Sequence, residues 1–121
     1  MASAAESKRI LVVDDSRVAR ETSTRMLERS GCVVYGAGDH NLAVRLMRAD
    51  HGIGVVLLDY ELPEDTTAIA AELAAVRPHV RIVGTSGRDH RADFSKMGVS
   101  RYVQKPWTIE DLIDAVRGDA A

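Results

Sequence analysis

The chain has 121 residues, of which 45% are hydrophobic and 28% charged, and its formal net charge is −2. This length suits one domain that buries its core without disulfides, and the single cysteine, Cys32, is expected in that core. No apolar run approaches the roughly 18 residues of a membrane span, and the 16 basic residues are scattered among acids. The composition therefore argues against a membrane protein and against a basic nucleic-acid-binding surface.

The first half of the chain alternates apolar runs with helical patterns. Strands are predicted over 9–13, 32–35 and 53–58, and Gly36 and Gly38 are read as a turn after the second strand. The helix after the first strand is expected to end at Gly31. Its predicted apolar face consists of Val18, Ala19, Thr22, Met26 and Leu27.

The second half repeats the alternation after a loop that contains Pro63. The predicted elements are, in order, a helix over 68–76, a strand over 80–84, a short helix over 91–97, a strand over 99–103 and a final helix over 109–116. Thr108 is a natural N-cap for the last helix. Pro78 stops the helix over 68–76. The four histidines have no metal-ligand spacing and are expected at the surface.

Strands that alternate with helices in this way predict an α/β fold, a doubly wound five-stranded parallel sheet covered on both faces. Right-handed crossovers bring every strand-to-helix loop to one edge of such a sheet. Ligands bind at that edge, beyond the carboxyl ends of the strands and where the strand order reverses.

Polar side chains stand at these strand ends. Asp14 and Asp15 close the first strand, and Asp59 closes the third. Three carboxylates at one edge repel one another, unless they bind a divalent cation or one of them is kept reactive. Lys105, after the fifth strand, would supply a fixed positive charge. Taken singly, each residue also fits a solvated turn or a strand end; taken together, they point to phosphoryl transfer.

Four short motifs occur in order at these positions: Val13-Asp14-Asp15-Ser16, Leu58-Asp59, Gly84-Thr85-Ser86-Gly87 and Gln104-Lys105-Pro106-Trp107. In this the chain resembles the receiver domain of two-component response regulators, over roughly residues 8–117. The resemblance is to chemotaxis-type single-domain receivers. It implies a flavodoxin-like (βα)5 fold with strand order 2-1-3-4-5. The small and polar residues 1–7 are expected to form a flexible arm, and residues 118–121 are expected to form a tail after the last helix.

The resemblance also implies roles for the residues that contact a phosphoryl group. Asp59 would be the nucleophile that accepts it, and Lys105 and the Thr85 hydroxyl would contact its oxygens, with Ser86 as the fallback for Thr85. Tyr102 occupies the aromatic switch position of the family, where the ring turns inward when Thr85 moves toward the phosphoryl group. The Lys105–Pro106 bond is a candidate cis peptide.

Mg²⁺ is the cofactor that the resemblance implies. Asp15, Asp59 and the backbone carbonyl of Glu61 would hold it, and Asp14 would act through a metal-bound water. The loop after Asp59 departs from the family pattern, because Glu64-Asp65-Thr66-Thr67 lacks the usual glycine and the stretch from Asp59 to Thr85 is a few residues short. The geometry of this loop is therefore the least predictable part of the site.

The implied function is a cytoplasmic signalling switch rather than an enzyme with a metabolite substrate. A histidine kinase or phosphotransfer protein would donate the phosphoryl group near the first helix. The fourth helix, fifth strand and fifth helix would then contact a downstream protein, or pair two copies in a phosphorylation-dependent homodimer. The chain would be either a single-domain regulator or a fragment of a larger one. Two alternatives remain open: a pseudo-receiver that only binds, and a Mg²⁺-dependent phosphatase built on Asp59-Tyr60-Glu61.

Overall fold

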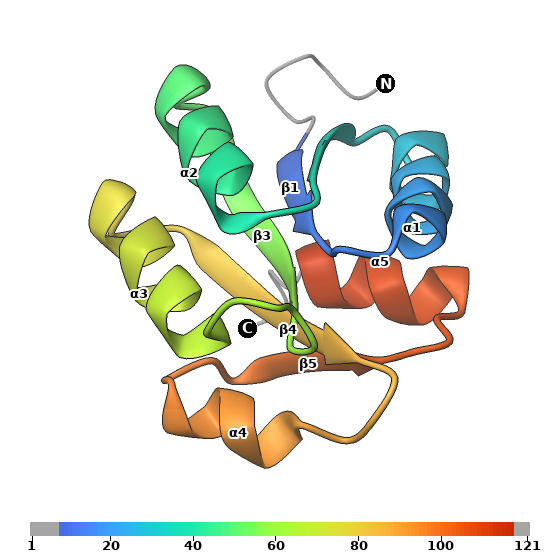
Figure 1. Cartoon of the computed structure of the whole chain (residues 1–121). Coiled ribbons are helices and arrows are strands. Elements are labelled where there is room, and N and C mark those ends of the chain that lie inside the picture. The colour runs from blue at the N-terminus through green and yellow to red at the C-terminus, as the bar shows by residue number, and fades with distance from the viewer. Residues whose placement is uncertain (1–7, 118–121) are drawn as a thin grey trace.

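The structure, a computed structural model, describes residues 8–117, and the arm at 1–7 and the tail at 118–121 predicted above lie outside the described residues. Strands and helices alternate along the chain (Figure 1). The elements are β1 (Arg9–Val13), α1 (Arg17–Arg29), β2 (Val33–Ala37), α2 (His40–Ala49), β3 (Ile53–Asp59), α3 (Thr66–Val76), β4 (Arg81–Ser86), α4 (Arg91–Lys96), β5 (Arg101–Gln104) and α5 (Ile109–Arg117).

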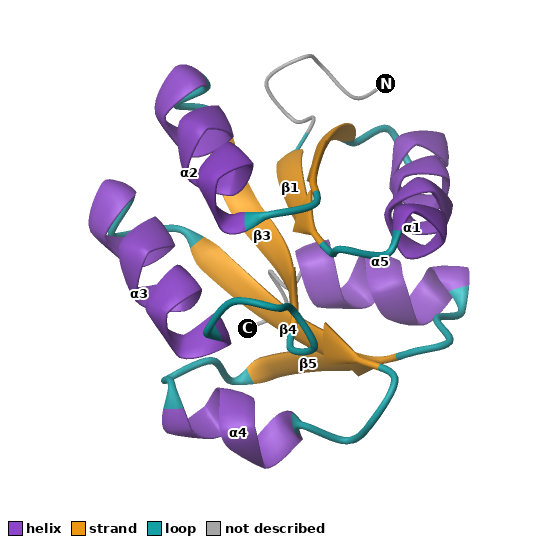
Figure 2. Ribbon diagram, in the orientation of Figure 1, coloured by secondary structure: helices purple, strands orange, loops and turns teal. Residues whose placement is uncertain are grey.

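The five strands form one parallel sheet in the order β2-β1-β3-β4-β5, which confirms the predicted α/β class and strand order. Helices α1 and α5 cover one face, and α2, α3 and α4 cover the other (Figures 1 and 2). Because the chain leaves β1 toward β2 and then returns to β3 on the other side, the strand order reverses between β1 and β3. The carboxyl ends of these two strands therefore flank the crevice where this fold binds ligands.

The alternation of side chains along the central strands divides the core into two layers. Beneath α1 and α5 lies one buried cluster: Ile10, Val12, Leu27, Cys32, Val55, Leu57, Val83, Val103, Leu112 and Val116. Beneath α2, α3 and α4 lies the larger one: Leu11, Val13, Ala37, Ala43, Val44, Met47, Ile53, Val56, Leu58, Ile69, Ala70, Leu73, Phe94 and Val99. The central strands are thus buried on both faces, and Cys32 is a core residue as expected.

The predicted apolar face of α1 is wrong at two positions. Val18 is 75% exposed and Thr22 is exposed, whereas Ser23 and Leu27 are buried. Ser23 can lie in the core because its hydroxyl bonds to the carbonyls of Ala19 (2.9 Å) and Arg20 (3.1 Å), which leaves no unsatisfied polar group. A serine at a core position breaks the hydrophobic pattern on which the prediction depended.

Several further boundaries differ from the predictions, among them the end of β4, which is Ser86 and not residue 84. Gly36 lies inside β2 and not in a turn, because β2 pairs with β1 as far as Ala37. The fifth strand begins at Arg101, two residues later than predicted, although Val99 is buried. Helix α3 begins at Thr66, where the Asp65 carboxylate accepts the backbone N–H of Thr67 at 2.9 Å. An aspartate cap thus starts this helix without the usual glycine.

Gly84 lies within β4 and faces Phe94 of α4, where only a glycine fits. A Cβ at this position would overlap the ring of the buried Phe94, with Cδ2 the nearest atom. We expect Gly84→Ala to lower the free energy of unfolding by about 1–3 kcal/mol, the usual cost of overpacking a core, as measured by urea denaturation. Gly54→Ala in β3 is the matched control, since a Cβ there meets nothing within 4 Å. Equal stability of the two variants would contradict this account of Gly84.

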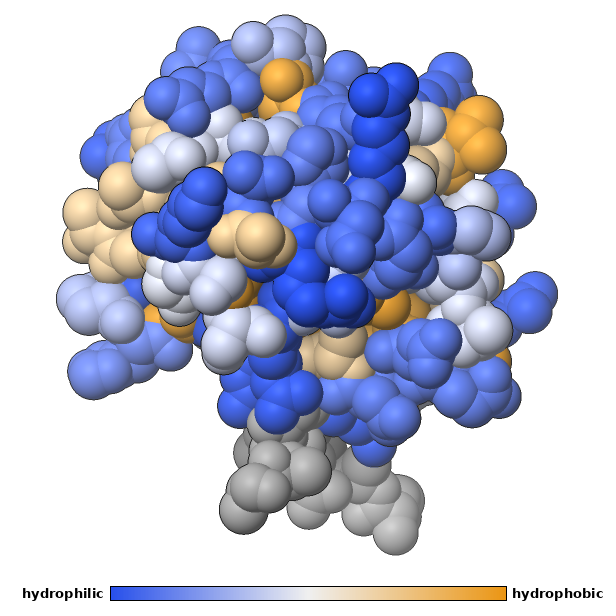
Figure 3. Space-filling view, turned by 90° about the horizontal axis from the view of Figure 1, so that it is seen from below, coloured by the Kyte–Doolittle hydropathy of each residue, from blue (hydrophilic) through white to orange (hydrophobic). Residues whose placement is uncertain are grey.

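The face that α4 occupies at the bottom of Figure 1 is predominantly polar, and hydrophobic residues appear on it only in small separate patches (Figure 3). Among the described residues, no helix is long and apolar enough to cross a membrane.

Candidate functional site

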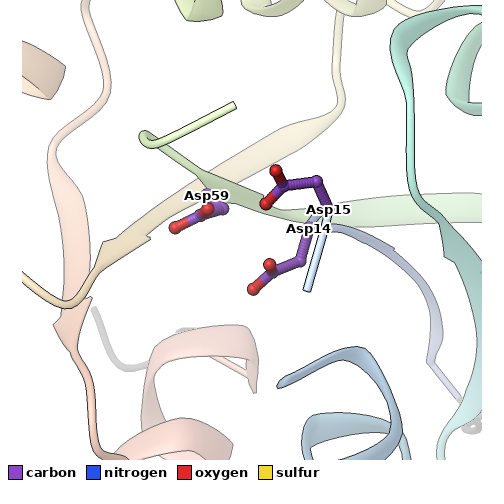
Figure 4. A group of neighbouring side chains, drawn as sticks. All are labelled: Asp14, Asp15 and Asp59. Carbon is purple, nitrogen blue, oxygen red and sulfur yellow. The ribbon is translucent and has the colours of Figure 1, made fainter. Parts of the chain in front are cut away.

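Three carboxylates gather at the carboxyl ends of β1 and β3 (Figure 4). Asp14, Asp15 and Asp59 each offer an oxygen, and these atoms lie within 4.8 Å of one another. Asp14 and Asp59 are buried, whereas Asp15 is exposed and opens the cluster to solvent. The structure therefore brings the three predicted acids together in one place.

Backbone hydrogen bonds extend the sheet ladder past the strand ends and position this cluster. The N–H of Asp14 donates to the carbonyl of Ala37 on β2 at 3.0 Å. The N–H of Tyr60 donates to the carbonyl of Thr85 on β4 at 2.9 Å. The carboxylates that adjoin these bonds are held by the sheet itself and not by mobile loop backbone, which is the preorganisation that a reactive site needs.

Lys105 supplies the positive charge at the cluster. Its ammonium donates to Asp14 Oδ2 at 2.7 Å and lies 3.4 Å from Asp59 Oδ1. The backbone N–H of Lys105 donates to the carbonyl of Ser86 at 3.0 Å, so β4 fixes the backbone from which the lysine side chain projects. The Lys105–Pro106 peptide bond is cis.

The charges perturb one another. Burial is the main reason why the pKa of Asp59 is raised to about 6, and the neighbouring Asp14 charge is the second, with attraction to Lys105 offsetting both in part. Burial alone would lower the pKa of Lys105, but the hydrogen bond to Asp14 and the charge of Asp59 outweigh it and leave that pKa raised. The lysine is therefore a permanent cation beside an acid whose charge is costly.

The donor set fits a hard divalent cation. All three candidate ligands are carboxylates, and oxygen ligands are those that Mg²⁺ and Ca²⁺ prefer. Asp59 Oδ1 is moreover buried and accepts no well-aligned hydrogen bond among the described residues; its charge is met only by the Lys105 ammonium at 3.4 Å, which leaves this oxygen available to a cation.

Thr85 lies beside Asp59 in the β3–β4 register and is buried, but its hydroxyl is turned toward β5. It donates to the carbonyl of Val103 at 2.6 Å and accepts the indole N–H of Trp107 at 3.0 Å. Trp107 follows the Lys-Pro pair, and its hydrogen bond to Thr85 was not foreseen from the sequence. An aromatic residue after Lys-Pro signals packing, and only the three-dimensional register shows that the indole N–H reaches Thr85.

The loop after Asp59 is held by side chains. The Thr66 hydroxyl donates to the carbonyl of Tyr60 at 2.7 Å, which closes the short connection to α3. The Glu61 carboxylate accepts the Ser86 hydroxyl at 3.0 Å and lies 3.8 Å from Nε of Arg88. Ser86 thus faces Glu61, on the opposite face of the sheet from Thr85. The carbonyl of Glu61 as a metal ligand stays a prediction.

Comparison with known proteins identifies the family of this chain. The family model of the response regulator receiver domain matches residues 10–117, which is nearly the whole of the described chain. The chain belongs to the receiver-domain family.

Bacterial proteins with different names are similar to it. The transcriptional regulatory protein PdtaR of Mycobacterium tuberculosis is 34% identical over 119 residues, which cover 95% of this chain and 58% of PdtaR. A protein-glutamate methylesterase/protein-glutamine glutaminase of Azospirillum brasilense is 36% identical over 113 residues, which cover 86% of this chain and 28% of that protein. The chain therefore spans little more than half of the first relative and under a third of the second, and the methylesterase name describes a much longer protein.

Solved receiver structures share the fold. A response regulator of Burkholderia pseudomallei, crystallised with a phosphorylated aspartic acid, a calcium ion and citrate, has a TM-score of 0.81 and 28% identity, covering 90% of this chain and 66% of the other. A receiver domain of Clostridium thermocellum has a TM-score of 0.83 and 26% identity, covering 92% of both chains. The first of these carries both a modified aspartate and a divalent cation.

Tyr102 of this receiver domain is half-buried and tied to the β4–α4 loop. Its hydroxyl lies 2.7 Å from the carbonyl oxygen of Arg88 and accepts the backbone N–H of His90 at 3.3 Å. The ring contacts Phe94 on one side, and the Arg91 guanidinium lies 4.9 Å from its centroid. The residue predicted as the switch is therefore connected to both α4 and the loop that precedes it.

Two histidines are not the surface residues that were predicted. His90 is half-buried, stacks on Tyr60 with ring centroids 3.9 Å apart, and lies 2.8 Å from Asp93 through Nδ1. His40 is also half-buried and lies 2.6 Å from Glu72 on α3. Both histidines lie at the start of a helix. Asp93 follows His90 by three residues, whereas Glu72 reaches His40 from the neighbouring helix α3, so sequence spacing reveals only the pair of His90 and Asp93.

Proposed function

We propose that this receiver domain is a phosphoacceptor switch that takes a phosphoryl group onto Asp59. The observation that carries the proposal is the cluster of Asp14, Asp15 and Asp59 at the strand-order reversal, with the Lys105 ammonium in contact with Asp14 and Asp59. The family match and the phosphorylated aspartic acid of the Burkholderia pseudomallei relative support it. The domain acts on itself and on its partners, and it has no metabolite substrate.

The chain's own residues would act as follows. An Asp59 carboxylate oxygen attacks phosphorus in line and forms the new O–P bond, while the bond from phosphorus to the donor breaks and its electrons leave with the donor. Lys105 already lies beside Asp59 and would pair with a phosphoryl oxygen, which offsets the added negative charge. The Thr85 hydroxyl would contact a second oxygen after turning away from Val103.

Mg²⁺ is the cation we propose for the acidic cluster. Asp15 and Asp59 would hold it directly together with the carbonyl of Glu61, and Asp14 would contact it through water. When bound, the ion would neutralise the charge that otherwise keeps a phosphoryl dianion away from a carboxylate.

The partners we propose are a histidine kinase or phosphotransfer protein, as donor in the cytoplasm, and a downstream protein or second copy at the α4, β5 and α5 surface. The tie between Tyr102 and the β4–α4 loop supports this second contact, because a turn of the ring would release Arg88 and His90. The polar character of the face around α4 suits a reversible contact better than a permanent one (Figure 3). We also propose that residues 8–117 are the folded receiver unit.

Intact mass after incubation with acetyl phosphate and Mg²⁺ tests the proposal. We expect wild-type protein to gain the mass of one phosphoryl group, and Asp59→Asn or EDTA to abolish the gain. Asp50→Asn is the matched control, because Asp50 lies at the other end of the sheet, where it contacts Arg9 and Tyr35, and should leave the gain intact.

Each way in which this experiment could contradict the proposal identifies a different alternative. An adduct that survives in Asp59→Asn would place the phosphoryl group elsewhere and overturn the role of Asp59. No adduct in the wild type, with no binding of the phosphoryl mimic beryllofluoride, would instead identify a pseudo-receiver. Sustained hydrolysis of a generic phosphate ester would favour the phosphatase alternative.

A further inference from the structure

Trp107 contacts the phosphoryl-binding group that the proposed function requires to move. Its indole N–H donates to Thr85 Oγ1 at 3.0 Å, and the same hydroxyl donates to the carbonyl of Val103 at 2.6 Å. The hydroxyl thus uses its one hydrogen on β5 and one lone pair on Trp107. Both partners hold it on the β5 side, away from any ligand at Asp59.

The position of Trp107 connects this contact to α5. The residue is half-buried, packs against the core cluster beneath α1 and α5, and directly precedes Thr108, whose hydroxyl caps α5 by accepting the N–H of Asp111. Lys105 Nζ lies 5.6 Å from the centroid of the indole ring. One side chain therefore approaches both groups proposed to contact the phosphoryl oxygens and stands at the start of a helix.

We propose that Trp107 is a positioning residue whose N–H holds Thr85 in the unphosphorylated arrangement and opposes its turn toward the phosphoryl group. The inference rests on the proposed function. The turn of Thr85 breaks the Trp107 hydrogen bond, and the freed indole changes the surroundings of the α5 N-terminus. This connection is separate from Tyr102, which pairs in register with Gly84 and points to the opposite face of the sheet.

The hydrogen bond between Trp107 and Thr85 affects the equilibrium between the unphosphorylated and phosphorylated arrangements, because only the first of them contains it. A neutral hydrogen bond that exists only in the unphosphorylated state shifts the equilibrium toward that state, and its removal shifts the equilibrium back. Trp107→Phe deletes the N–H and keeps an aromatic ring against the core. We therefore expect this variant to bind beryllofluoride in the presence of Mg²⁺ about threefold to tenfold more tightly than the wild type.

A double-mutant cycle, with affinities measured by titration calorimetry, tests the inference. Thr85→Val removes the hydroxyl and should weaken beryllofluoride binding, and adding Trp107→Phe to Thr85→Val should then have no further effect. Tyr35→Phe is the matched control, because it also deletes one hydrogen bond of an aromatic side chain, the 2.6 Å contact with Asp50. Unchanged or weaker binding by Trp107→Phe, or the same gain in the Thr85→Val background, would overturn the inference.

A second measurement does not depend on the folding of Trp107→Phe. The chain has one tryptophan, so a ¹⁵N–¹H correlation spectrum contains a single indole N–H signal. We expect beryllofluoride to shift this signal in the wild type, and Thr85→Val to shift it in the same direction without ligand. A signal that saturating beryllofluoride leaves in place would refute the inference. Failure of the proposed function is distinguishable, because wild-type protein would then form no adduct with acetyl phosphate and bind no beryllofluoride.

Discussion

Lys105→Met is expected to destabilise the fold by about 3–5 kcal/mol at neutral pH in the absence of divalent cations, the usual cost of leaving a buried charge without its partner. The lysine side chain is 20% exposed, and the Asp14 and Asp59 side chains that it contacts are 2% and 3% exposed. Methionine keeps most of the aliphatic stem, so the loss reports the charge and not a cavity. Urea denaturation in EDTA measures it.

Two comparisons sharpen this prediction. Arg9→Met removes a cation from an ion pair with Asp50 that solvent reaches, since the Arg9 side chain is 47% exposed, and we expect a much smaller loss. Mg²⁺ should restore part of the stability of Lys105→Met, because a cation at the cluster replaces the missing charge. A loss no larger than that of Arg9→Met would show that Lys105 does not compensate the buried acids.

Asp59→Asn is expected to act in the opposite direction and to stabilise the metal-free protein above pH 6. The pKa of Asp59 is about 6 in the folded protein against an ordinary value of 3.8. Because the folded pKa is raised, the stability that protonated Asp59 gives the folded state is fully present below pH 3.8. That stability is lost as the pH rises through 6. The difference between the two pKa values corresponds to about 3 kcal/mol, which asparagine would recover at pH 7.5 and not at pH 4.

Asp50→Asn is the control of opposite sign. Hydrogen bonds from Tyr35, the backbone of Gly52 and Arg9 lower the pKa of Asp50 to about 2, so its carboxylate stabilises the fold above pH 3.8 and loses that effect as the pH falls toward 2. Asparagine at position 50 should therefore destabilise the protein at neutral pH. Chemical denaturation of both variants in EDTA across pH 4–8 measures these changes. If Asp59→Asn were less stable than the wild type at pH 7.5, burial of the Asp59 carboxylate would not destabilise the fold.

The sheet and its edge were predictable because their signals are local and repeated. The apolar runs that end at Val13 and Leu58 are unbroken, and in a parallel sheet their carboxyl ends must meet at one edge, which brings Asp14 and Asp59 together without any side-chain detail. The order of the strands came from the family resemblance and not from the periodicity.

What could not be predicted depends on single hydrogen bonds between distant residues. Ser23 is a core residue because of two carbonyls on its own helix, and hydrophobicity ranks it below Val18, which is exposed. The direction of the Thr85 hydroxyl depends on Trp107, 22 residues later. Contacts of this kind follow from side-chain rotamers in the finished fold, and neither periodicity nor motif spacing contains them.

Among the described residues, two glycines have a positive φ, and both lie at the edge of the sheet opposite the acidic cluster. Gly31 (φ 92°) and Gly98 (φ 83°) follow α1 and α4, and a Cβ built at either would meet nothing within 4 Å. The turns after these helices lie far along the strands from the acidic cluster, and open space surrounds both glycines. Protein engineers could therefore graft a fluorophore-binding peptide or a second domain into these connections while the strand-to-helix loops keep their length, which would turn this chain into a modular reporter.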